Sequence, residues 1–118
     1  MTHPSVGTFT PSAEAVRILT RIAMLLDQAT REAADLRRTE LSLRTSDLGL
    51  EAMLMWAETV AMLPGQTYPE VEVVAVGKDP VALFRQAERL SAELPIEQFP
   101  RGMSQLIVRL IVAIRDLA

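Results

Sequence analysis

The sequence predicts an all-α protein, a compact bundle of about four helices that forms a single domain over residues 1–118. Three observations predict this fold. Apolar residues recur at spacings of three and four, as in helices that bury one side. Hydrophobic residues make up 49% of the 118 residues but aromatic residues only 4%, so the core is built from helix-favouring aliphatic side chains. Cap and breaker residues divide the chain into four such segments.

The first predicted helix follows an extended N-terminal arm, residues 1–11, which carries Pro4, Gly7 and Pro11. Ser12 is the expected N-cap, because its hydroxyl can accept a hydrogen bond from the first helical turn. The sequence allows this helix to end near Thr39 or to continue to Arg44, because no glycine or proline occurs before Gly49. A single apolar stripe follows the cap: Ala15, Ile18, Leu19, Ile22, Leu25, Leu26, Ala29, Ala33 and Leu36.

The second predicted helix starts at the cap-like cluster Thr45-Ser46-Asp47 and stops before the breaker pair Pro64-Gly65. Met55 and Met62 are expected to point nearly away from the core, with Trp56 and Leu63 on the flank between. The expected core face consists of Leu50, Met53, Leu54, Ala57, Val60 and Ala61.

A long connection, residues 64–78, separates the second and third helices. Within it the sequence VEVVAV (71–76) is rich in β-branched residues, which favour a short strand. A strand here would pair with the N-terminal arm near residues 6–10 or with a second chain. Otherwise the segment is an irregular loop packed on the bundle.

The third predicted helix begins at Asp79-Pro80, an N-cap followed by proline in the first helical position. It runs to about Leu94, before Pro95, and the link PIEQFP leads to a fourth helix from about Arg101. One side of the third helix faces the core: Leu83, Phe84, Ala87, Leu90 and Leu94.

The fourth predicted helix has two apolar faces. Its apolar arc covers roughly 260°, against about 100° for an ordinary surface helix. The second face consists of Val108, Ile111 and Val112, and Arg109 is expected at its rim, with its head group on Asp116, another carboxylate or water. The first face is expected in the bundle: Met103, Leu106, Ile107, Leu110, Ile114 and Leu117.

The second apolar face of the fourth helix and the outward-pointing Met55 and Met62 of the second helix have two possible explanations. The arm and residues 64–78 cover them, or a partner does, most simply a second copy. The favoured interpretation is a non-enzymatic interaction or assembly module, a homodimer or a small subunit or adaptor in a larger complex. The expected interface consists of Val108, Ile111, Val112, Arg109 and Arg115 on the fourth helix and Met55, Met62 and Trp56 on the second.

A nucleic-acid interface is one alternative function. Arg17, Arg21, Arg31 and Arg38 share one side of the first helix and would contact phosphates in a small subunit of a nucleoprotein complex. Against this, the net charge is −3 and no aromatic residue interleaves the arginines. Asp27 and Asp35 flank Arg31 at i−4 and i+4, where intrahelical ion pairs are expected.

A small all-α enzyme that binds an anionic substrate with arginines is the other alternative. The chain has no cysteine and a single histidine, His3, in the arm, so neither a catalytic residue nor a metal site nor a cofactor is predicted. The acids Asp47, Glu51 and Glu58 are expected on a solvated helix face.

We expect a cytoplasmic location and no association with a membrane. The first residues, MTHPSVGTFTP, lack the basic and apolar regions of a signal peptide. The fourth helix is too short for a bilayer core of about 30 Å, and Arg109 lies in its middle.

Overall fold

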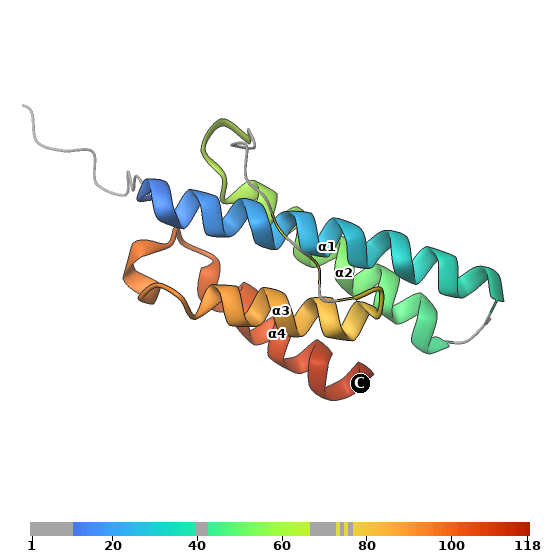
Figure 1. The fold of residues 1–118 in the computed structure, drawn as a ribbon. Helices are drawn as coiled ribbons and strands as arrows, with labels where there is room; N and C mark the ends of the chain where they lie inside the picture. Colours follow the sequence, from blue (N-terminus) through green and yellow to red (C-terminus); the bar gives the residue numbers. More distant parts are fainter. Residues whose placement is uncertain (1–10, 40–42, 67–72, 74, 76) are drawn as a thin grey trace, which may run out of the picture.

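The computed structural model describes residues 11–39, 43–66, 73, 75 and 77–118 and shows an all-α four-helix bundle (Figure 1), which confirms the predicted fold class. No strand occurs among these residues. Residues 1–10 of the predicted arm and most of the 71–76 segment lie outside them, while Val73 and Ala75 are half-buried against the core. The elements are α1 (Ala13–Thr39), α2 (Leu43–Ala61), the short 3-10 helix η1 (Pro64–Gln66), α3 (Pro80–Ser91), a second 3-10 helix η2 (Ile96–Gln98), and α4 (Met103–Leu117).

The predicted caps Ser12 and Asp79 are confirmed, whereas the predicted cap cluster Thr45-Ser46-Asp47 lies inside α2, which already begins at Leu43. The Ser12 hydroxyl accepts a hydrogen bond of 3.1 Å from the backbone N–H of Ala15. The Asp79 carboxylate accepts one of 3.3 Å from the N–H of Val81, and Pro80 occupies the first turn. α1 ends at Thr39, the earlier of its two expected ends, whereas α3 ends at Ser91, before the predicted Leu94, and α4 begins at Met103, two residues after the predicted Arg101.

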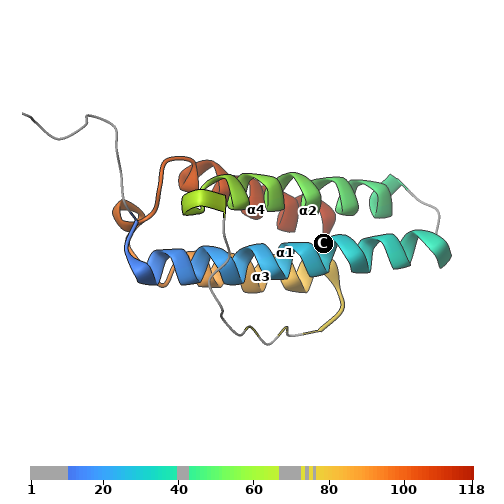
Figure 2. The same ribbon diagram turned by 90° about the horizontal axis from the view of Figure 1, so that it is seen from above.

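The four helices form a ring in the order α1, α2, α4, α3 (Figures 1 and 2). Each helix runs antiparallel to its two neighbours in the ring, so α2 and α3 lie diagonally opposite and point the same way. The chain between α2 and α3 therefore has to cross the length of the bundle, which explains why this connection is long. Because α2 and α4 are neighbours in the ring, they form one two-helix side of the molecule.

The core is aliphatic, as the composition predicted. Fully buried large side chains come from all four helices, and Phe84 on α3 is the aromatic residue among them. The predicted buried faces of α1 and α3 are confirmed, except that Leu36, Leu90 and Leu94 are only half-buried. The largest buried side chains are Ile18, Leu19, Ile22, Leu25, Leu26, Leu48, Met55, Leu83, Phe84, Met103, Leu106 and Leu110.

The orientation of α2 is the reverse of the predicted one. Leu50, Met53 and Leu54, expected in the core, are exposed, whereas Met55, expected to face a partner, is fully buried. The true core face consists of Thr45, Leu48, Ala52, Met55, Thr59 and, just beyond the helix, Leu63. Thr59 is tolerated inside because its hydroxyl donates a hydrogen bond of 2.7 Å to the carbonyl oxygen of Met55.

Small residues let α1 and α2 approach closely. Ala29, Ala33 and Ala52 are fully buried. Gly49 faces α1, where a methyl group added to its Cα would lie 3.7 Å from the Cβ of Ala33. That distance is an ordinary van der Waals contact, so the space at Gly49 accommodates the methyl group of alanine.

We expect Gly49→Ala to raise the free energy of unfolding by up to about 1 kcal/mol, because alanine costs less backbone entropy than glycine inside a helix. Urea denaturation measures the change. Gly49→Leu is the matched contrast, and overpacking against Ala33 should lower stability by about 1–3 kcal/mol. Destabilisation by alanine itself would show that the two helices lie closer than described.

Candidate functional site: the outer face of α2 and α4

The most exposed large apolar side chains gather on one side of the bundle. Of the eight in the described chain, six lie on α2 and α4, with exposed fractions between 37% and 59%. Met24 on α1 and Ile96 in η2 are the other two. We call the side carrying the six the α2–α4 face: Leu50, Met53, Leu54, Val108, Ile111 and Val112. Val108, Ile111 and Val112, the predicted second face of the fourth helix, all belong to the α2–α4 face.

A groove of about 820 Å³ runs along this face between the two helices. Its apolar lining comes from Leu50 on α2 and from Val108, Val112, Ala113 and Leu117 on α4. Asp47 and Asp116 lie at one end of it. A smaller hollow of about 410 Å³, lined by residues that include Met62 and Arg101, lies along the same helix pair, and Gln105 borders both.

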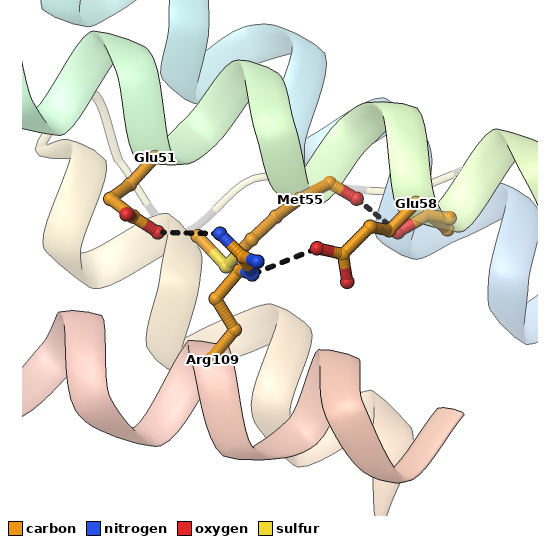
Figure 3. A network of polar contacts seen from close by, with 5 residues as sticks. Glu51, Met55, Glu58 and Arg109 are labelled. Atoms are coloured by element: carbon orange, nitrogen blue, oxygen red, sulfur yellow. Dashed lines mark hydrogen bonds and ion pairs between the residues drawn. The ribbon is translucent and has the colours of Figure 1, made fainter. Parts of the chain in front are cut away.

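Arg109 bridges α4 and α2 beside the groove (Figure 3). Its Nε atom lies 2.8 Å from Oε1 of Glu58, and its Nη1 atom lies 3.8 Å from Oε2 of Glu51. The two glutamates are seven residues apart, so they lie on the same side of α2. The side chains are only partly exposed, 41% for the arginine and 31% for each glutamate. Arg109 thus fixes the alignment of α4 along α2.

Of the three partners expected for Arg109, which were Asp116, another carboxylate or water, the structure shows another carboxylate. A carboxylate does receive its head group, but Asp116 pairs with Arg115 instead, at 3.0 Å. Glu51 and Glu58 were expected on a solvated face, and the structure places both at the contact with α4. Their heptad spacing opposite the arginine in the middle of α4 was the available signal.

We expect a measurable coupling between Arg109 and Glu58 in a double-mutant cycle of Arg109→Met and Glu58→Gln. Partly exposed pairs contribute about 0.2–1 kcal/mol, and partial burial places this one in the upper half of that range. Urea denaturation of the four proteins gives the value. The control cycle uses Asp35 and Arg38, a pair on α1 at 3.3 Å with exposures of 63% and 79%. Equal couplings in both cycles would contradict a bridging role for Arg109.

Of the second-helix residues predicted at the interface, Met55 and Trp56 lie elsewhere, whereas Met62 lines the smaller hollow. Met55 is in the core, and Trp56 is half-buried against it and lines neither hollow. Met62 is half-buried, and its sulfur would lie 3.7 Å from a Cβ at Gly102. On α2 the outward apolar positions are therefore Leu50, Met53 and Leu54.

The arginine row on α1 is partly neutralised. Arg31 pairs with Asp27 at 3.1 Å, as predicted, and Arg38 pairs with Asp35, which was expected to pair with Arg31. Arg17 is exposed and Arg21 half-buried. Because neighbouring carboxylates match the charges of Arg31 and Arg38, the row carries less net positive charge than its arginines alone suggest.

Comparison with protein-family models, curated proteins and solved structures found no match to this chain. In the described part of the chain, no group of three or more acidic or histidine side chains is placed to hold a metal ion. None of the described helices combines the length and apolar character needed to cross a membrane. The fold assigns the chain to the all-α four-helix bundles.

Proposed function

We propose that this protein is a non-enzymatic interaction module that binds a protein partner through the α2–α4 face. The observation that carries the proposal is the exposure of six large apolar side chains on two neighbouring helices. Covering each of them would contribute about 25 cal/mol per Å² of apolar surface removed from water. Contiguous exposed apolar surface of this kind typically marks a contact site.

The polar groups beside the groove also fit a docking surface. Glu58 and Glu51 already neutralise the charge of Arg109, so this arginine needs no carboxylate from a partner protein. The groove therefore offers apolar walls from Leu50, Val108 and Val112. A partner helix with an apolar stripe would match such a surface, in the manner of helices that dock in grooves.

A matched pair of variants tests the proposal. Leu54 on the α2–α4 face and Met24 on α1 are both 38% exposed, so glutamate at either position places a charge at a site of equal exposure. Sedimentation measures self-association, and immobilised protein measures capture of a partner from native lysate. Leu54→Glu should abolish whichever association the wild type shows, whereas Met24→Glu should retain it. Equal behaviour of the two variants, or no association by the wild type in either assay, would refute the proposal.

A further inference from the structure

We infer that the α2–α4 face is covered by a second copy of this chain, related by a twofold axis parallel to the helices, so that α2 of each copy packs antiparallel on α4 of the other. The inference rests on the proposed function and names the partner. A twofold contact uses the same surface on both sides, so one apolar face serves both copies.

The composition of the face fits a permanent dimer. Along α2 the outward positions Leu50, Met53, Leu54, Ala57 and Ala61 are all exposed and all uncharged. Homodimer interfaces are more apolar than transient ones, and charged residues are depleted from their centres. On α4, Val108, Ile111 and Val112 supply the matching apolar surface.

The alignment of the two helices places their apolar residues at the same level. Arg109 lies between Glu51 and Glu58 along α2, and Leu50 faces Val112 across the groove. A rotation about an axis parallel to the helices preserves this level. The apolar residues of α2 in one copy therefore meet those of α4 in the other.

Charge at one end of the face selects this arrangement. Asp47 lines the groove together with Asp116 and Leu117, so it lies level with the last turn of α4, which also carries Arg115. Rotation about the parallel axis brings Asp47 of one copy to Arg115 of the other, twice in the dimer. Arg115 binds Asp116 through Nε, and arginine has five N–H donors, which allows a second carboxylate. Opposed charges of this kind fix register and partner orientation.

The other twofold arrangement lacks this complementarity. With the axis perpendicular to the helices, α2 would pack on α2 and α4 on α4. Asp47 would then lie near Ala61 at the far end of the partner's α2, and Arg115 would lie near the partner's Ser104, neither of which carries a charge.

A charge-swap experiment on the full chain tests the inference. The wild type should sediment as a dimer. Asp47→Arg and Arg115→Asp should each weaken dimerisation at least tenfold, because each homodimer then contains two like-charge pairs. An equimolar mixture of the two variants should recover dimers within about threefold of the wild-type dissociation constant, since both pairs are again opposite in the heterodimer. Asp35→Arg and Arg38→Asp on α1 are the controls and should show no such pattern, and circular dichroism confirms the fold of each variant.

The outcomes separate this inference from the proposed function. A wild-type dimer that is disrupted by Leu54→Glu but unaffected by either charge variant would overturn the α2-on-α4 arrangement and leave the face as the contact site. A wild type that stays monomeric at millimolar concentration would overturn the inference that a second copy covers the α2–α4 face. In that case, capture of a different protein that is lost in Leu54→Glu would still support the interaction module.

Discussion

Ile111→Asp is expected to abolish association through the α2–α4 face while the helical fold is retained. Ile111 is 49% exposed in the isolated bundle, so an aspartate there is solvated in the monomer but buried without a partner in the complex. An uncompensated buried charge costs about 3–5 kcal/mol, which corresponds to at least a hundredfold weaker association. The free energy of unfolding of the monomer should change by less than about 1 kcal/mol. Sedimentation and urea denaturation at low protein concentration measure the two effects.

The neighbouring residue provides the control. Leu110 is fully buried on the opposite side of α4, so Leu110→Asp should unfold the bundle. If Ile111→Asp also unfolds the protein and the wild type is a monomer, the outer face of α4 belongs to the intramolecular core. The arm or the connection between α2 and α3 would then be its cover.

Phe84→Ala is expected to produce the largest loss of stability among single truncations. Phe84 is the largest fully buried side chain and comes from α3, the shortest of the four helices. Removal of a buried phenyl ring costs about 3–5 kcal/mol through lost transfer free energy and the remaining cavity. Because domains of this size have only about 5–15 kcal/mol of stability, the variant should lose a large part of its resistance to urea.

Arg85→Ala is the control for this variant, because Arg85 is adjacent in sequence but exposed. Its effect should stay within about 0.5 kcal/mol. A loss below 1 kcal/mol for Phe84→Ala would contradict the central place of α3 in the core.

The sequence was most informative where one residue type has one structural role. The Asp79-Pro80 start of α3 and the Ser12 cap of α1 were predictable from local hydrogen bonding and backbone geometry. The core faces of α1 and α3 were predictable because charged residues occupy the opposite side.

The orientation of α2 could not be predicted in the same way, because both of its faces are apolar. Periodicity identifies stripes but does not say which stripe is buried, and the stripe of Leu50, Met53 and Leu54 has larger side chains than much of the true core face. That core face also contains two buried threonines, Thr45 and Thr59, so its sequence pattern looks polar. The salt bridges of Arg109 join separate helices, and only the arrangement of the helices brings those residues together.

The ring order of the helices has a consequence for the order of folding. α1 and α2 share the largest helix–helix interface and follow one another along the chain, so their contacts close a short loop. Local contacts form fast, whereas α4 docks on α2 only after residues 103–117 have been synthesised. Until then, the newly made α1–α2 hairpin exposes apolar side chains on both sides of α2. The nascent chain is therefore most prone to aggregation in the interval before Arg109 reaches Glu58.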